Sequence, residues 1–501
     1  MADDVRIGGV AEAAHGAQGG VRCPSSLCDP AHAVVMLSTG WPAHARAYDR
    51  DDWLNTWGVQ MRRMARIARL VMPVGVALSL VTACGGGSGD NHGGTEKGRA
   101  TTSSSATPKA GPYDPPLKFV SQGSTVVPGG IGDGPWSFRL EGATVYAVSD
   151  AEVKAVSALD GRRLWDVKPQ GEPTKNVTYS HDDKPGQPTL VTLDGRSAVL
   201  AAFPVTVPGA GTTPDRNAIE LTALAADSGK RLWTTTVERP ERQQEGNVIL
   251  AGSDGKTAAL KIGKDTDALT LGDPVTLGIA LDTHKTVWTA SGFAAKFVDD
   301  GVVVGLGDSN PDTSGDLSVQ GLGLADGKET WTHEAPELNT ARLDHAGSGL
   351  FTAEMKLGTV NDDDSAVLLS TATGRVPDGA ASIELKGSLP HLSCWFDAQA
   401  TIVCDARPGL EGGRQHVFAL DAKTFKELWL IEEGDSSRLL PSISSAWHGA
   451  VYGSTTNGPV ILDARTGKDK STDPGITPSQ VNAHAGLVEG RMGVEVYRAT
   501  G

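Results

Sequence analysis

The sequence predicts an all-β fold in which repeated four-stranded antiparallel sheets stand side by side in a closed ring. Three observations predict it. Short runs of β-branched residues and leucine fill much of the chain, 62 glycines and 28 prolines in 501 residues interrupt them, and one turn pattern recurs from residue 156 onwards. A single sheet of this kind cannot bury its own faces, whereas a ring of such sheets can.

The recurring unit is a strand, a tight turn and a second strand. It is seen in VSALDGRRLWDV (156–167) and LTALAADSGKRLWTTTV (221–237). Seven units align on the turn residue, which is followed in every case by a basic residue. Five of the turn residues are glycines, namely Gly161, Gly229, Gly327, Gly374 and Gly467, and the other two are His284 and Phe425. Glycine adopts positive φ without steric strain, so the unit predicts a tight hairpin turn.

A tryptophan stands four positions after the turn residue in five units: Trp165, Trp233, Trp288, Trp331 and Trp429. The fifth and seventh units carry Asp378 and Ser471 there instead. Because a large ring at a fixed place in a repeat can cover the seam between neighbouring sheets, we interpret these tryptophans as core residues. The alternative is that they stack on sugars or bases. We expect the two seams without tryptophan to pack less tightly.

The pattern ALDxxTGKxxW resembles the repeat of the PQQ-like β-propeller family. It occurs here as FALDAKTFKELW, ILDARTGK and LAADSGKRLW, and the resemblance covers nearly all of residues 113–501. Strand-like segments at 117–127 and 482–501 would pair to complete one more sheet and leave no open edge. We therefore predict an eight-bladed β-propeller of four-stranded antiparallel blades, closed by pairing of its N- and C-terminal strands, with seven blades as the alternative.

The segment 61–84 predicts an export signal that ends in a lipid anchor. Four arginines precede an apolar run, 70–83, of about 14 residues, which is too short to span the roughly 30 Å core of a membrane as a helix. The run ends in Val-Thr-Ala-Cys84, which resembles a bacterial lipobox whose cysteine accepts the lipid. A buried helix that ends in cysteine is the alternative. We expect a lipoprotein on the extracytoplasmic side of the cell membrane.

This interpretation divides the chain into four parts. Residues 1–60 are an over-extended or disordered N-terminus, 61–83 a signal peptide, 84–112 a flexible Gly/Ser/Thr tether, and 113–501 the propeller. Outside the cytoplasm, Cys394 and Cys404 are predicted to form a disulfide across one hairpin. A two-cysteine metal site is the alternative, although no histidine or further cysteine at ligand spacing completes it.

The sequence predicts no catalytic residue and no metal ligand. The family resemblance suggests a quinone-dependent dehydrogenase, but such enzymes carry adjacent cysteines, which this chain lacks. Residues 308–316 begin like a calcium loop, yet Thr313 stands where glycine is needed and Val319 where the closing Glu is needed. No cofactor is expected, and PQQ is suggested by the family resemblance alone.

The remaining features favour a binding protein over an enzyme. A net charge of −15 and a pI near 5.3 disfavour nucleic acid as a partner. Uneven insertions are expected to form loops over the propeller faces, where repeat scaffolds bind their partners; they are 168–188, 204–218, 308–316, 361–365 and 406–414. We predict a monomeric, membrane-anchored scaffold that binds an envelope protein, a peptide or a cell-wall ligand. A PQQ-dependent dehydrogenase and a ligand-sensing ectodomain are the alternatives.

Overall fold

A computed structural model gives the fold of one compact unit, Thr102–Gly501. The residues that it describes are 111–128, 135–174, 186–243, 246–263, 274–308, 317–335, 338–358, 364–380, 384–409, 413–435, 437–490 and 493–501. These residues form eight antiparallel sheets and one 3₁₀ turn, η1 (Glu241–Gln243), with no α-helix among them. The predicted all-β, eight-bladed architecture is confirmed, and the seven-bladed alternative is wrong.

The first four sheets follow one another along the chain, one for each blade. Blade 1 comprises β2 (Ser137–Glu141), β3 (Thr144–Val148), β4 (Val153–Ser157) and β5 (Arg163–Val167). Blade 2 comprises β6 (Glu172–Pro173), β7 (Thr189–Leu193), β8 (Arg196–Val207), β9 (Arg216–Ala225) and β10 (Arg231–Glu238). Blade 3 comprises β11 (Asn247–Ser253), β12 (Thr257–Gly263), β13 (Val275–Ala280) and β14 (Lys285–Ser291). Blade 4 comprises β15 (Phe293–Asp299), β16 (Val302–Asp308), β17 (Leu317–Gly323) and β18 (Glu329–His333).

The other four blades continue in the same order. Blade 5 comprises β19 (Leu338–Gly347), β20 (Leu350–Leu357), β21 (Ser365–Ser370) and β22 (Glu384–Lys386). Blade 6 comprises β23 (His391–Phe396), β24 (Thr401–Arg407), β25 (His416–Asp421) and β26 (Glu427–Glu432). Blade 7 comprises β27 (Ser442–Trp447), β28 (Ala450–Thr455), β29 (Gly458–Asp463) and β30 (Asp469–Ser471). Blade 8 comprises β31 (Gln480–Val481), β32 (Ala485–Gly490), β33 (Gly493–Arg498) and β1 (Ser124–Pro128).

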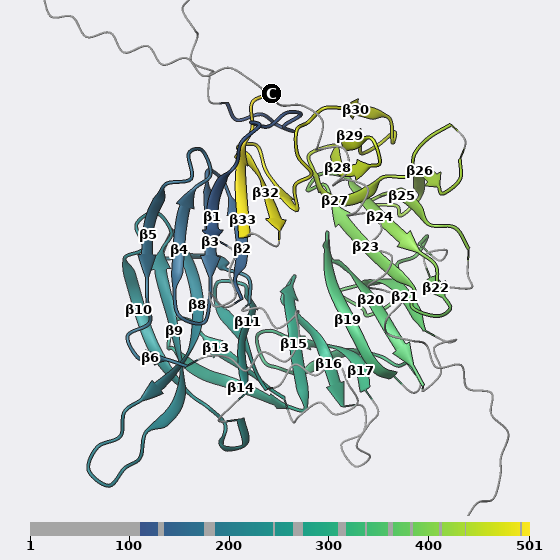
Figure 1. Cartoon of the computed structure of the whole chain (residues 1–501). Coiled ribbons are helices and arrows are strands. Elements are labelled where there is room, and N and C mark those ends of the chain that lie inside the picture. The colour runs from purple at the N-terminus through teal and green to yellow at the C-terminus, as the bar shows by residue number, and fades with distance from the viewer. Residues whose placement is uncertain are drawn as a thin grey trace, which may run out of the picture. The chain divides into compact units, whose positions relative to one another are not determined.

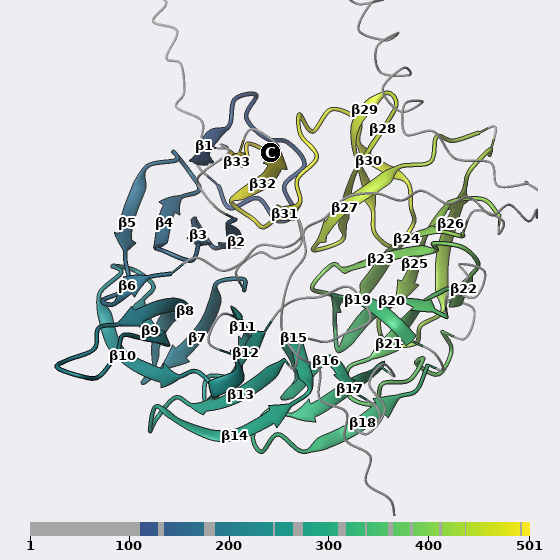
Figure 2. The same cartoon turned by 60° about the horizontal axis from the view of Figure 1, so that its bottom comes forward.

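The blades stand around a common centre, and in the four-stranded blades the first strand is innermost and the fourth lies on the outside (Figures 1 and 2). The ring closes in blade 8, where β1 from the start of the propeller pairs antiparallel with β33 near its end. A further bridge joins Phe119 to Ala499, and the Tyr452 hydroxyl of blade 7 donates a hydrogen bond to the carbonyl of Pro116 at 2.9 Å. The N-terminal strand thus completes the blade formed by the C-terminal strands.

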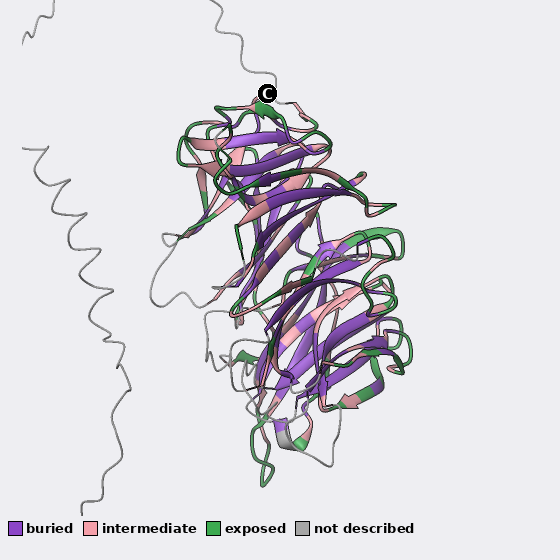
Figure 3. Cartoon of the chain, turned by 90° about the vertical axis from the view of Figure 1, so that its right-hand side faces the viewer, coloured by how far each residue is buried: buried purple, intermediate pink, exposed green. Residues whose placement is uncertain are grey.

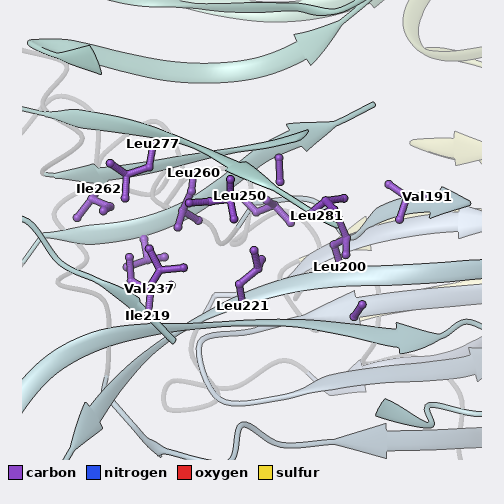
Figure 4. Packing of buried hydrophobic residues seen from close by; sticks show 14 of the residues in the cluster. Val191, Leu200, Ile219, Leu221, Val237, Leu250, Leu260, Ile262, Leu277 and Leu281 are labelled. Atoms are coloured by element: carbon purple, nitrogen blue, oxygen red, sulfur yellow. The ribbon is translucent and has the colours of Figure 1, made fainter. Parts of the chain in front are cut away.

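The hydrophobic core is divided among the seams between blades. Eight clusters of buried side chains occur in the described residues, and each lies between two neighbouring blades. Figure 3 shows this burial running along the strands, while the hairpin tips are exposed. At the seam between blades 2 and 3, Leu200 and Leu221 face Leu250 and Leu260 (Figure 4). Each blade is therefore held mainly by its two neighbours, as expected for a repeat architecture.

One local prediction is wrong. The segment 204–218, predicted to be a loop, is largely a hairpin because β8 and β9 keep their pairing out to Val207 and Arg216. β-branched residues at 205–207 favour this extension. In blade 5 the outer strand β22 begins at Glu384, ten residues after the turn glycine Gly374, and Pro377 between them lacks the N–H that a strand there would donate.

Candidate functional site

The repeat tryptophans lie on the outer strands and bind the turn of the following blade. The indole N–H groups of four of them donate hydrogen bonds to main-chain carbonyls three residues before the next turn glycine. The pairs are Trp165 with Ala226 (3.2 Å), Trp288 with Leu324 (2.8 Å), Trp331 with Thr371 (2.7 Å) and Trp429 with Ala464 (2.7 Å). Each tryptophan thus links one blade to the next by both packing and a hydrogen bond.

The turn glycine has a second role that the sequence reasoning missed. Gly374 has a φ of +63°, which predicts glycine by itself, but a Cβ at this position would also lie 2.2 Å from the Trp331 ring. The same close approach joins three further pairs, Gly229 with Trp165, Gly327 with Trp288 and Gly467 with Trp429. At these four seams the tryptophan of one blade therefore requires glycine at the turn of the next.

The other turns use different partners. Gly161 of blade 1 receives no indole, and a Cβ there would lie 2.2 Å from the Cβ of Ser124 on the closing strand β1. The blade 3 turn holds His284 instead of glycine, and the Trp233 ring stacks against its imidazole with centroids 4.4 Å apart. The seam between blades 2 and 3 thus keeps a ring-on-turn contact without a turn glycine.

The seam between blades 5 and 6 departs furthest from this pattern. Asp378 stands where blade 5 should supply a tryptophan, and its side chain is exposed. The turn of blade 6 carries Phe425 at a φ of +55°, half-buried against the cluster between these blades. Phe425 is thus the aromatic residue that this turn contributes to the seam.

A pocket of about 590 Å³ lies around the turn of blade 5, between the outer strand of blade 4 and the turn of blade 6. It is lined by Thr330, Trp331, Ser348, Gly349, Leu350, Ser370, Ala372, Thr373, Arg375, Val376, Pro377, Asp378 and Phe425. These residues come from the outer strand of blade 4, two turns of blade 5 and the turn of blade 6.

The lining of the pocket combines aromatic, aliphatic and charged groups. Trp331 and Phe425 supply rings, and the Val376 side chain, 36% exposed, supplies an aliphatic edge. Arg375 and Asp378 place a cation and an anion at the opening, and both residues are exposed. Six of the thirteen lining residues are polar or charged, so the pocket offers apolar contacts and hydrogen-bonding groups in about equal number.

The loop that opens the pocket is held by its own hydrogen bonds. The N–H of Ala380 donates to the carbonyl of Pro377 at 3.0 Å, and the N–H of Ser370 donates to the carbonyl of Arg375 at 2.8 Å. Gly379 in turn lies against the blade 6 turn, since a Cβ on it would be 3.0 Å from the Thr424 carbonyl oxygen. Contacts within the protein therefore form the pocket without a ligand.

The predicted disulfide lies in blade 6, outside the pocket lining. Cys394 and Cys404 form a disulfide across β23 and β24, with their Cα atoms 4.1 Å apart. Cys84 lies outside the described residues, as do the predicted signal peptide and nearly all of the tether. No helix in the described part of the chain is both long and apolar enough to span a membrane.

The described residues do not fit a calcium–quinone site. No three His, Cys, Asp or Glu side chains among them are placed to share a metal ion. Their two cysteines bridge different strands and are not neighbours in the chain. The candidate site is therefore the pocket in blade 5.

Comparison with known proteins agrees with the repeat pattern. Residues 137–253, which include all of blades 1 and 2 and the first strand of blade 3, match the model of a PQQ-like repeat family described as "Outer membrane protein assembly factor BamB". This part of the chain thus resembles the PQQ-like repeat family, and the described residues as a whole form an eight-bladed β-propeller. A search of curated proteins gave no match to it.

Solved structures with a similar fold include two bacterial propellers. BamB from Moraxella catarrhalis is 14% identical with a TM-score of 0.39, over 75% of this chain and 98% of its own. The quinohemoprotein alcohol dehydrogenase ADHIIG from Pseudomonas putida HK5 is 11% identical with a TM-score of 0.38, over 73% of this chain and 74% of its own. Because one fold can host many functions, the function of this propeller must be argued from its own residues.

Proposed function

We propose that this propeller is an extracytoplasmic binding scaffold, held at the cell envelope, that docks a protein partner through the pocket in blade 5. The partner places an aromatic side chain between Trp331 and Phe425. The observation that carries the proposal is the replacement of a repeat tryptophan by Asp378, beside a preformed pocket of about 590 Å³.

The propeller itself supports the choice of an aromatic ligand. At four other seams an indole lies on the turn of the following blade and donates a hydrogen bond to its main chain. At the seam between blades 5 and 6 that ring is missing from the chain, while the surrounding turns are kept. Arg375 and Asp378 at the opening would select among partners by the charges that flank the aromatic residue.

The matched family supports a protein partner. Its description as an assembly factor of outer-membrane proteins names a role in which one protein acts on others. Aromatic anchors that enter a pocket are the usual source of binding energy in such contacts. The partner is therefore expected to lose most of its affinity when one aromatic residue is removed.

Photo-crosslinking tests the docking site. A crosslinking amino acid at Val376 is expected to capture one recurring envelope protein, while the same group at Val287, an exposed valine of blade 3, does not. The double variant Asp378→Trp/Phe425→Gly, which restores the repeat pattern and fills the pocket, should lower capture at least about tenfold. Equal capture at both positions, or capture unchanged by filling the pocket, would reject this site.

Attachment to the membrane is tested separately at Cys84. The sequence pattern predicts that its thiol carries the lipid, so Cys84→Ala should move the protein from the membrane fraction to the soluble fraction. Continued membrane association of the variant would contradict the lipid anchor. The dehydrogenase alternative is tested with added PQQ and calcium, where saturable quinone absorbance with dye reduction would replace the scaffold proposal.

A further inference from the structure

A second group of side chains lies on the innermost strand of blade 6. β23 is the edge strand of its sheet, and it contacts β19 and β27, the first strands of the two neighbouring blades. It therefore borders the centre of the ring (Figure 2). His391 and Ser393 stand two residues apart on β23, so they share one face of the strand, and both are partly exposed.

Ser393, His391 and Glu354 form a chain of hydrogen bonds. The Ser393 hydroxyl Oγ lies 3.1 Å from Nε2 of His391. The other ring nitrogen of His391, Nδ1, lies 2.5 Å from Oε1 of Glu354 on β20 of blade 5. The side chains of His391 and Glu354 are 32% and 19% exposed, so the hydroxyl end of the chain is open and the carboxylate end is sheltered. The order hydroxyl, imidazole, carboxylate is the one by which an imidazole activates a serine.

The surroundings of Glu354 keep it charged. Burial alone would raise the pKa of its carboxyl group, but the hydrogen bond and charge of His391, the Leu392 N–H and the charge of Arg342 together lower the pKa below its ordinary value. The Leu392 N–H donates to the same oxygen, Oε1, at 3.1 Å. An ionised Glu354 fixes the proton of His391 on Nδ1 and leaves Nε2 free to accept the proton of Ser393.

The backbone of β23 supplies a donor beside the serine. The N–H of Leu392 points away from β24, because it donates to Glu354, and the register between the two strands is regular. Since N–H directions alternate along an antiparallel strand, the N–H of Cys394 also points to the open edge. It belongs to the residue directly after Ser393, where a main-chain N–H can stabilise a developing oxyanion. The disulfide from Cys394 to Cys404 holds this part of the strand in place.

We propose that Ser393, His391 and Glu354 form a hydrolytic site for carboxylic esters at the centre of the ring. This activity is separate from docking at the pocket in blade 5. Ser393 is the nucleophile and His391 the general base. Glu354 orients the imidazole and stabilises the imidazolium that forms during the reaction, and it does not touch the substrate. Trp395 follows on the same face of β23, so it offers an apolar wall for the acyl group.

The reaction balances with water as the only co-reactant. Oγ of Ser393 attacks the ester carbonyl carbon while its proton passes to Nε2 of His391. The ester C–O bond then breaks, and His391 returns the proton to the leaving alkoxide, which departs as an alcohol. Water adds to the acyl-serine with its proton going to Nε2, the bond to Oγ breaks, and the carboxylic acid leaves as the serine regains its proton.

The first test labels the full chain with a fluorophosphonate, which reacts with activated serines. Peptide mapping by mass spectrometry is expected to place the label on Ser393. The matched control is Ser442, an exposed serine at the start of β27, the first strand of blade 7, and it should remain unlabelled. No labelling of Ser393 in the folded wild-type protein would overturn the proposal without the need for any variant.

The second test follows hydrolysis of p-nitrophenyl acetate. Ser393→Ala and His391→Gln should each lower kcat/KM by about 100-fold or more, while Ser442→Ala leaves it unchanged. Glu354→Gln keeps an oxygen for the Leu392 N–H, so it should lower kcat at least about tenfold with KM unchanged, and Glu354→Asp should retain more activity. Wild-type activity in Ser393→Ala, or a change in KM alone in Glu354→Gln, would reject the assignment.

Discussion

The seam between blades 4 and 5 and the seam between blades 5 and 6 show the same repeat in two states. In the first, Trp331 lies on Gly374, and its indole donates to the carbonyl of Thr371. In the second, both members of the pair have changed, to Asp378 and Phe425, and a pocket is present. The outer-strand residue of one blade and the turn residue of the next are therefore structurally coupled, so a change at one requires a matching change at the other.

The largest expected effect is the loss of a repeat tryptophan. Trp331 is 8% exposed, so Trp331→Ala should lower the free energy of unfolding by about 3–5 kcal/mol, since it removes buried ring area and leaves a cavity. Asp378→Ala changes the equivalent residue of blade 5 and should cost less than about 0.5 kcal/mol because that side chain is exposed. Urea unfolding of both variants measures the difference, and similar losses would show that the two seams are equivalent.

The next effect separates backbone strain from the collision with the ring. Gly374→Ala places a methyl group 2.2 Å from the Trp331 ring and should cost about 2–4 kcal/mol. Gly301 has a φ of +76°, and a Cβ added to it would meet nothing within 4 Å, so Gly301→Ala should cost only about 1 kcal/mol. If both variants lose the same stability, the indole does not constrain the turn.

A double-mutant cycle tests whether the two changes at the open seam are coupled. Asp378→Trp alone should be neutral or destabilising, because the turn that would receive the new ring carries Phe425 and not glycine. With Phe425→Gly added, the indole can lie on the turn as it does on Gly374, and the coupling free energy should favour the double variant by about 1–2 kcal/mol. Additive effects in urea unfolding would contradict the structural coupling of the two residues.

The smallest expected effect concerns pH at the seam between blades 4 and 5. Asp299 accepts a hydrogen bond from Thr371 at 3.0 Å and lies 3.2 Å from Nε2 of His345. Burial alone would raise the pKa of Asp299, but the hydrogen bond and charge of His345, together with the Thr371 hydroxyl, lower the pKa below its ordinary value. Since the folded pKa lies below the unfolded one, which is about 4, this stabilisation is present above the unfolded value and is lost as the pH falls through the folded value.

Asp299→Asn isolates this contribution. The variant should be less stable than the wild type at pH 6, by about 1 kcal/mol or less, and the two should converge near pH 2. Urea unfolding at both pH values measures the change, and Asp378→Asn, at an exposed site without such partners, serves as the control. A wild-type advantage that persists at pH 2 would assign the effect to packing and not to the charge.

Sequence reasoning predicted the fold because its strongest signals are local. Glycine at the turn and tryptophan four residues later mark the third and fourth strands of a blade, and strand-like ends predict closure of the ring. Local reasoning is insufficient at Asp378, because the sequence shows the missing tryptophan but does not connect it with Phe425. The two residues belong to different blades, and only packing shows that they compensate.

The hydrogen-bonded chain on β23 was missed for the same reason. His391 and Ser393 fit no known short motif, and Glu354 is supplied by the neighbouring blade. No spacing in the sequence predicts that contact, because it depends on how two separate sheets meet.

By itself, the sequence determined the kind of structure that this chain forms. Turn chemistry and alternation of apolar residues act within a few residues, so they specify strands and hairpins, whereas the sequence left seven blades open as the alternative to eight. The tertiary structure alone decided which side chains meet across the seams, and hence where the pocket and the Ser393–His391–Glu354 group lie. Contacts between blades depend on the relative position of whole sheets, which is set by burial of their faces and by closure of the ring.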